Sequence, residues 1–98
     1  MRQKQPATYI LANRKHGTVY VGVTSNLVGR VHQHRTGATG GFTTKYRVHR
    51  LVHFELHDTM ELAIYREKVI KHWPRARKVR LIEQAHPVWR DLYVDICR

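Results

Sequence analysis

This sequence of 98 residues lacks the features that mark several common classes of protein. It has one cysteine, Cys97, and a lone thiol can form neither an intrachain disulfide nor a cysteine metal site. No apolar run approaches the ~20 residues that cross a bilayer, and the apolar stretch behind the basic N-terminus is too short for a signal peptide. We therefore expect a soluble, cytoplasmic protein with no membrane partner. The chain is also too short for a second domain, so we expect one domain over residues 1–98, with residues 1–6 as a flexible basic tail.

Acidic residues are scarce as well: 7 Asp and Glu stand against 18 Lys and Arg, which gives a net charge of +11. The basic residues are spread along the chain rather than gathered in a tail, so the folded surface itself should be basic. A polyanionic partner usually accompanies such an imbalance. We expect nucleic acid, with DNA as the first candidate. An acidic protein or an anionic membrane surface would explain the same charge.

The first third of the chain has the pattern of a β-hairpin. Residues 8–12 and 19–23 are rich in β-branched and aromatic side chains, and residues 13–18 between them have turn chemistry. So short a connection predicts two antiparallel strands, on which Tyr9 and Tyr20 could lie close to each other.

A helix is expected directly after the hairpin. Ser25 or Asn26 can cap a helix over residues 27–36, and Gly37 can end it. The glycines that follow predict a flexible loop over residues 37–44.

The second half of the chain predicts one more strand and two more helices. Residues 50–56 form the strand, and Asp58 followed by Glu61 resembles a capping box that opens a helix over residues 59–72, which Pro74 closes.

A further helix is expected over residues 75–84, and the apolar side chains of residues 87–98 should pack against the domain. The predicted order is β-β-α-β-α-α. We therefore predict an α+β fold in which a three-stranded antiparallel sheet is flanked by helices.

Glu67 stands out because it falls within the apolar face of its predicted helix, between Met60 and Ala63 on a helical wheel. Burying a carboxylate is costly unless it meets a cation or a metal ion. Lys71 lies one turn further on, so an ordinary i, i+4 ion pair at the edge of the core explains the same pattern. The position alone leaves both interpretations open.

Arg30 and His34 are also four residues apart and share one face of their helix. A basic face that contacts phosphates without specificity is one interpretation. The sharper one is that the planar guanidinium grips the phosphate being cut, with a histidine beside it. Tyr9 and Tyr20, taken alone, would be core or rim aromatics.

Taken together, these residues match a known family. The chain resembles the GIY-YIG nuclease superfamily, and in particular its small, single-domain branch. Tyr9, in the segment ATY, falls on the first of the paired motifs, and Tyr20, in YVG, falls on the second. Arg30 matches the catalytic arginine of the family, His34 the histidine one turn later, and Glu67 the metal-binding glutamate.

The resemblance continues to the end of the chain and has one departure. Where this branch commonly has asparagine before a proline near the C-terminus, this chain has His86. The other matching segments are residues 41–46, 66–68, 81–83 and 87–92.

The resemblance implies a three-stranded antiparallel sheet flanked by helices and a divalent-metal-dependent endonuclease. One ion, Mg²⁺ or Mn²⁺, would bind Glu67, and a single carboxylate suffices because Mg²⁺ keeps several waters. Arg30 would stabilise the negative charge that develops on the phosphate.

The sequence does not identify the general base. By analogy, Tyr9 or Tyr20 would orient or deprotonate the attacking water, but lowering a tyrosine pKa from ~10 to ~7 takes roughly 4 kcal/mol. Lys45 or His34 could act as the base instead, and the hydroxyls could merely hold the water.

Lys45, Tyr46, Lys71 and Arg35 are the residues that we expect to contact nucleic acid. With no second DNA-reading module, the protein should bind with low sequence specificity and strong salt dependence. A nucleic-acid-binding module of the same fold with weak or lost catalysis is the alternative, and a basic protein-interaction domain is a third hypothesis.

Overall fold

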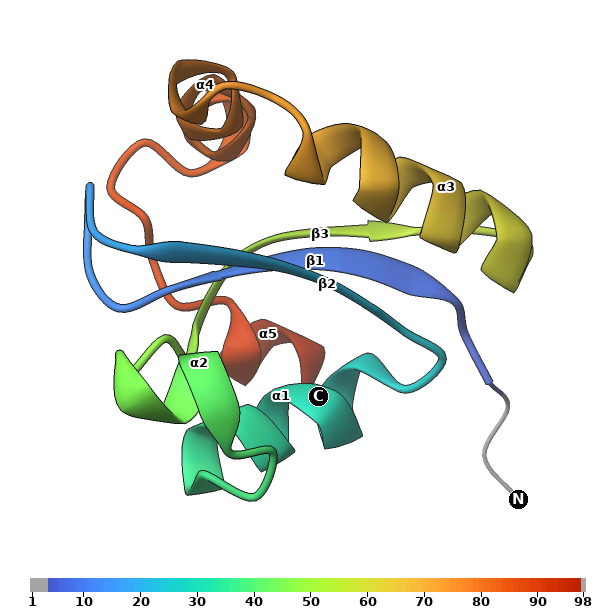
Figure 1. Cartoon of the computed structure of the whole chain (residues 1–98). Helices are drawn as coiled ribbons and strands as arrows, with labels where there is room; N and C mark the ends of the chain where they lie inside the picture. Colours follow the sequence, from blue (N-terminus) through green and yellow to red (C-terminus); the bar gives the residue numbers. More distant parts are fainter. Residues whose placement is uncertain (1–3, 98) are drawn as a thin grey trace.

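The computed structural model describes residues 4–97, and its centre is a three-stranded antiparallel sheet (Figure 1). β1 (Ala7–Ala12) is the middle strand, with β2 (Val19–Thr24) on one side and β3 (Arg50–Leu56) on the other. All six residues of β1 are buried. The predicted hairpin and the predicted α+β fold are both confirmed.

α1 (Leu27–Thr36) has the bounds that its end signals predict. The Asn26 side chain accepts a hydrogen bond from the backbone N–H of Gly29 and so caps the first turn. At the other end, Gly37 adopts a left-handed conformation with φ 79°, which a residue without Cβ reaches without strain.

The prediction of a flexible loop over residues 37–44 is wrong for its second half, because α2 (Gly41–Lys45) begins there. Gly40 and Gly41 both have positive φ angles, 62° and 66°, and they turn the chain into this short helix. The glycines that suggested a loop are therefore the residues that direct a sharp change of direction.

α3 (Met60–Lys71) is close to the predicted helix, but its cap differs. The side chain of Thr59, and not that of Asp58, accepts the hydrogen bond from the backbone N–H of Leu62, at 3.2 Å. The predicted capping box of Asp58 with Glu61 is therefore wrong. Asp58 and Thr59 are adjacent in the sequence, and both residue types are good N-caps, so the sequence does not show which of them caps the helix.

The C-terminal part packs against the domain, as predicted. α4 (Arg75–Ala85) starts directly after Pro74, and Trp89 and Leu92 are buried in the segment that follows it. α5 (Tyr93–Ile96), a single turn, lies within this segment and was not predicted.

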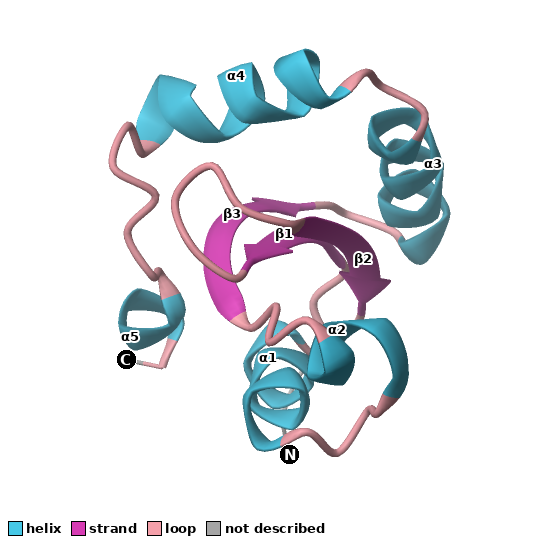
Figure 2. Ribbon diagram, turned by 60° about the vertical axis from the view of Figure 1, so that its left-hand side comes forward, coloured by secondary structure: helices cyan, strands magenta, loops and turns pink. Residues whose placement is uncertain are grey.

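Helices cover both faces of the sheet (Figure 2). α3 and α4 lie over one face, and α1, α2 and α5 lie over the other. No helix among residues 4–97 is long and apolar enough to span a membrane.

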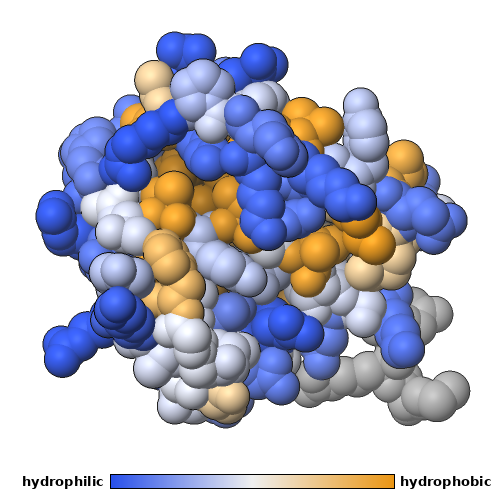
Figure 3. Space-filling view, viewed as in Figure 1, coloured by the Kyte–Doolittle hydropathy of each residue, from blue (hydrophilic) through white to orange (hydrophobic). Residues whose placement is uncertain are grey.

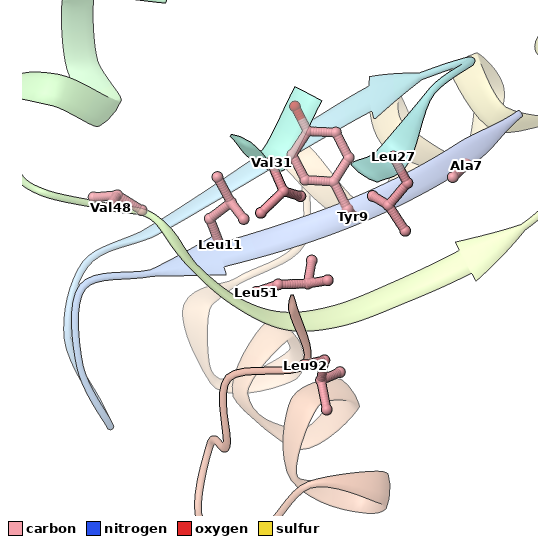
Figure 4. Close-up of a cluster of buried hydrophobic side chains, with 8 residues drawn as sticks. All are labelled: Ala7, Tyr9, Leu11, Leu27, Val31, Val48, Leu51 and Leu92. Atoms are coloured by element: carbon pink, nitrogen blue, oxygen red, sulfur yellow. The ribbon is translucent and has the colours of Figure 1, made fainter. Parts of the chain in front are cut away.

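The side chains of β1 alternate between two core clusters, as the pleat requires. The cluster on the α1 side contains Ala7, Tyr9, Leu11, Leu27, Val31, Val48, Leu51 and Leu92 (Figure 4). The cluster on the other side contains Ile10, Ala12, Val21, Val52, Ile70, Ile82 and Trp89.

The predicted flexible tail differs from the structure at Gln5 and Pro6. The backbone N–H of Gln5 donates to the Ser25 carbonyl at 2.9 Å, and the His57 N–H donates to the Pro6 carbonyl at 2.9 Å. Both residues therefore extend the sheet region, while residues 1–3 lie outside the part of the chain that the structure describes.

Glu55, on β3, is held by an ion-pair network. Arg66 of α3 donates two hydrogen bonds to its carboxylate, at 2.8 and 3.0 Å, and His53 lies 2.8 Å away. Burial alone would raise the pKa of Glu55, but the hydrogen bonds from His53 and Arg66 outweigh it and hold the pKa at about 2. This network ties α3 to the edge of the sheet formed by β3.

We predict that Glu55→Gln destabilises the protein by about 1–2 kcal/mol at pH 7, a discounted value because Arg66 is partly exposed to screening water. The folded-state pKa lies below the unfolded value of 4.5, so the contribution is present above that pH and is lost as the pH falls toward 2. Urea unfolding of the wild type and the variant at pH 7 and pH 3 measures the difference. Glu61→Gln, at an exposed site on α3, is the control. A stability gap between wild type and Glu55→Gln that does not shrink at pH 3 would contradict the assignment.

Candidate active site

The site is built around Tyr9, whose ring crosses the neighbouring strand. Tyr9 pairs with Gly22 of β2, and its side chain is 1% exposed. A Cβ built on Gly22 would lie 2.5 Å from the Tyr9 hydroxyl oxygen and 2.9 Å from Cε2. Glycine is therefore required at this position, because any side chain would occupy the space of the ring. The contact carries the Tyr9 hydroxyl across β2 toward the edge of the sheet.

The Tyr9 hydroxyl lies within hydrogen-bonding distance of His34. The side chain of His34 is 4% exposed, its Nε2 lies 3.0 Å from the Tyr9 hydroxyl, and its Nδ1 lies 3.0 Å from Oγ1 of Thr43. Thr39 adds a further hydroxyl at 3.2 Å from Nδ1 and 3.2 Å from the Thr43 hydroxyl. Thr43 belongs to α2, so this short helix fixes the orientation of the imidazole.

The electrostatic environment keeps both groups neutral. Burial lowers the pKa of His34, and the positive charge of Arg30 lowers it further. Burial raises the pKa of Tyr9, Tyr20 and Glu67 raise it further, and Arg30 opposes them. A neutral imidazole has one donor and one acceptor nitrogen. One of Nε2 and Nδ1 therefore donates a hydrogen bond to its neighbouring hydroxyl, and the other accepts one.

A hollow of about 250 Å³ opens beside this chain. Tyr20 and Arg30 line it together with His34, and the Tyr20 ring centroid lies 5.5 Å from that of His34. Phe42 of α2 stacks on Tyr20 at 6.3 Å and is half exposed. A larger hollow, of about 600 Å³, lies between the start of α1 and α5, but no such group of catalytic side chains lines it. We therefore take the smaller hollow as the site.

Glu67 approaches from α3, which packs against β2 and β1. It is 8% exposed and pairs with Lys71, whose Nζ lies 2.6 Å from Oε2. The negative charge of Glu67 helps to raise the pKa of Tyr9. The hydrogen bond to Glu67 and the charge of Glu67 raise the pKa of Lys71, and Tyr20 adds a smaller contribution in the same direction. The glutamate thus lies within electrostatic reach of the tyrosines, and the ion pair expected from the i, i+4 spacing is formed.

The donor set fits one kind of metal ion. Among residues 4–97 there is no group of three or more His, Cys, Asp or Glu side chains arranged to hold a metal. Zinc, which takes four protein ligands in structural sites and three in catalytic ones, is poorly matched to a single carboxylate. An ion that keeps several of its waters and uses one carboxylate, such as Mg²⁺, is compatible with Glu67.

The residues expected to contact nucleic acid are found in two places. Lys45 and Tyr46 are exposed at the end of α2, and the Tyr46 ring lies 4.8 Å from that of Phe42, beside the hollow. Arg35 faces away from it: its guanidinium pairs with Asp91 at 2.6 Å and lies 4.6 Å from the Tyr93 ring. Its interactions tie α1 to the C-terminal segment.

His86, which replaces the usual asparagine, caps the end of α4. Burial lowers its pKa, and the charges that act on it come from Arg90, His53 and Asp95. These residues belong to β3 and the C-terminal segment, and none of the three lines the hollow.

Thr39 and Thr43 are the site residues that sequence reasoning missed. They came from the segment predicted to be a flexible loop, which gave no reason to place their hydroxyls. The one available signal was that Thr43 lies in the segment GFTTKY, part of the resemblance to the family.

Comparisons with known proteins agree with the fold. The model of the GIY-YIG catalytic domain family matches residues 5–80. A UPF0213 protein of Syntrophus aciditrophicus is 38% identical over 68 residues, 68% of this chain and 78% of the relative. A UPF0213 protein of Haloquadratum walsbyi is 36% identical, covering 68% of this chain and 75% of that protein. The solution structure of a UPF0213 protein from Bacillus halodurans has a TM-score of 0.51 at 29% identity and covers 82% of this chain and 84% of its own.

We predict that Gly22→Ala destabilises the protein by about 1–3 kcal/mol, because the new methyl group overlaps the Tyr9 ring. A double-mutant cycle with Tyr9→Leu, followed by urea unfolding, tests the cause. The alanine should cost clearly less in the Tyr9→Leu background, where the far end of the ring is gone. An equal cost in both backgrounds would show that the strain has another origin.

Proposed function

Because the chain belongs to the GIY-YIG catalytic domain family, whose function is of the nuclease type, we propose that it is a divalent-metal-dependent endonuclease that hydrolyses phosphodiester bonds of DNA with low sequence specificity. The observation that carries the proposal is the convergence of four elements on one place. Tyr20, Arg30 and His34 line the same hollow from β2 and α1. Tyr9 of β1 lies within hydrogen-bonding distance of His34, and the charge of Glu67 on α3 acts on Tyr9.

Arg30 is assigned to the phosphate. Its side chain is exposed at the hollow, and its charge lowers the pKa of both His34 and Tyr9, so its positive field extends over the site. A guanidinium offers planar, paired donors that match phosphoryl oxygens and stays charged at every physiological pH. It would stabilise the negative charge that develops on the phosphate during hydrolysis.

Tyr20 and His34 are assigned to the attacking water because they line the hollow beside Arg30 and, unlike the threonine hydroxyls of the lining, can act as general bases. Tyr9 is buried and its raised pKa keeps the hydroxyl protonated, so it is a poor candidate for the base. Its hydrogen bond to Nε2 orients the His34 ring. Tyr9 is therefore a positioning residue, and a neutral His34 or Tyr20 receives or directs the proton of the water.

Glu67 would hold the divalent ion, Mg²⁺ or Mn²⁺. When bound, such an ion supplies Lewis-acid stabilisation of phosphoryl oxygens and a more acidic water. Lys71 now pairs with this carboxylate and must be displaced, which its exposed position permits: the Lys71 side chain is 51% exposed. The released ammonium group is then available for a phosphate of the substrate.

Low sequence specificity is proposed from the surface around the hollow. Lys45, Tyr46 and Phe42 of α2 offer charge and aromatic faces, which interact with phosphates and with any base.

A nucleic-acid-binding module with weak or lost catalysis is the second candidate, and one observation favours it. The Glu67–Lys71 ion pair neutralises the carboxylate whose charge acts on Tyr9. A protein that binds nucleic acid without a metal would have the same contact.

We predict that the protein nicks or cuts DNA with Mg²⁺ or Mn²⁺ and that EDTA abolishes the activity. Glu67→Gln should lower the cleavage rate by about 10²-fold or more, since it removes the metal-binding charge. The affinity for DNA in EDTA should remain within about 3-fold of wild type, because the negative charge of Glu67 repels a polyanion and makes no favourable contact with it. Rates on single-stranded, duplex and branched DNA provide the measurement.

The control is Glu61→Gln, which removes an exposed carboxylate from the first turn of the same helix. Equal cutting by wild type and Glu67→Gln would mean that the activity is a contaminant or that the site is misassigned. Binding without any cutting by either protein would establish the second candidate.

We also predict that Tyr9 and Tyr20 contribute differently to the cleavage rate. Tyr20→Phe should lower the cleavage rate by about 10²-fold, because we assign its hydroxyl to the attacking water, and Tyr9→Phe should cost less. Tyr65→Phe, at a side chain that is 69% exposed, should change nothing. Single-turnover rates over a range of pH separate the cases. A larger loss for Tyr9→Phe than for Tyr20→Phe would reverse the assignment.

A further inference from the structure

A second basic surface lies between α3 and α4, outside the candidate active site. A hollow of about 350 Å³ is formed there by Arg66, Trp73, Arg77, Arg80, Leu81 and Gln84. On the face shown in Figure 3, the upper part of the molecule, where α3 and α4 lie, is covered mostly by hydrophilic side chains with apolar patches between them. None of these six residues takes part in the site described above.

Two of the three arginines of this surface are held in place by an aromatic ring. The guanidinium of Arg77 lies 4.1 Å from the centroid of the Trp73 ring, and that of Arg66 lies 5.0 Å from it. Stacking of this kind fixes a flexible arginine without neutralising its charge. Trp73 is also partly buried, so little of its ring remains for a base to stack on.

The charge of the surface is only partly compensated. Arg66 is paired with Glu55, whereas no ion pair joins Arg77 or Arg80 to any of the described residues 4–97. Arg77 and Arg80 are both exposed and are three residues apart, so they share one face of α4. Two guanidinium groups thus present their donors to solvent, and stacking on Trp73 holds that of Arg77 in place.

This surface and the active site lie on different sides of α3. Arg66 reaches Glu55 on β3, while its neighbour Glu67 lies within reach of the tyrosines of β1 and β2. The order β2-β1-β3 places β2 and β3 at opposite edges of the sheet. A nucleic acid bound only at the active site therefore leaves the second surface free.

We propose that the α3–α4 surface is a second nucleic-acid contact, which binds the phosphate backbone of the substrate at a distance from the bond that is cut. The inference rests on nucleic acid being the partner, as in the proposed function. Unpaired guanidinium forks match phosphate oxygens, whereas the covered tryptophan offers no platform for reading bases. The contact is therefore independent of sequence and requires a substrate long enough to reach both surfaces.

The test is the double variant Arg77→Gln/Arg80→Gln in the full-length protein. Fluorescence anisotropy in EDTA measures the dissociation constants of a short and a long DNA duplex over a range of salt concentrations. The variant should bind the long duplex about 5- to 10-fold more weakly, with a salt-dependence slope lower by about 2, because two phosphate contacts are lost. Binding of the short duplex should change by less than about 2-fold.

The matched control is Arg14→Gln/Lys15→Gln, which removes the same charge from the exposed hairpin turn. Circular dichroism verifies that both variants are folded. The proposal is overturned if the control weakens long-duplex binding as much as Arg77→Gln/Arg80→Gln does, or if the latter binds the long duplex like wild type. It is also overturned if wild type prefers polyglutamate to DNA and the variant loses that binding, which would indicate an acidic protein partner. Long-duplex binding that depends on Arg77 and Arg80 in a protein that cuts nothing would support this inference while removing the proposed endonuclease activity.

Discussion

The contact between the Tyr9 ring and the bare backbone of Gly22 is the constraint on which the site depends. It makes one side chain a member of the hydrophobic core and a member of the polar site at the same time. A smaller residue at position 9 would leave a cavity and no hydroxyl, and a larger residue at position 22 would displace the ring. The geometry of the site is therefore protected by the same packing that stabilises the sheet.

The site is assembled from groups that reach the β2 edge of the sheet from both faces. α1 and α2 supply a rigid, neutral histidine with hydroxyls on both nitrogens, and α3 supplies a buried carboxylate with a movable cation. Burial and Arg30 act in the same direction on His34, so its neutrality at physiological pH does not depend on a single contact. A general base must be unprotonated before it can accept a proton, and the lowered pKa keeps the imidazole in that form.

How much could be predicted from the sequence depends on how local each feature is. α1 was predicted with its observed bounds because Asn26 and Gly37 are signals at its ends. α2 was missed because glycines at positions 40 and 41 fit a loop and a sharp turn equally well, and only the packing of Thr43 against His34 decides between them. The place of Glu67 on an apolar face left two interpretations open, and the family resemblance singled it out; the approach of α3 to the β2 edge could not be derived from any helical wheel. The α3–α4 surface combines residues of two helices and has no signature in either one.

The central position of β1 also fixes the order in which the site can form. β1 pairs with β2 through a short turn, whereas its pairing with β3 joins Ala7 to Leu56 and closes a much longer loop. Tyr9 and Tyr20 can meet as soon as the hairpin exists, but Glu67 follows β3 in the chain. During synthesis on the ribosome, Glu67 therefore emerges after the other residues of the candidate site, and a nascent chain that already has both tyrosines, Arg30 and His34 still lacks this carboxylate.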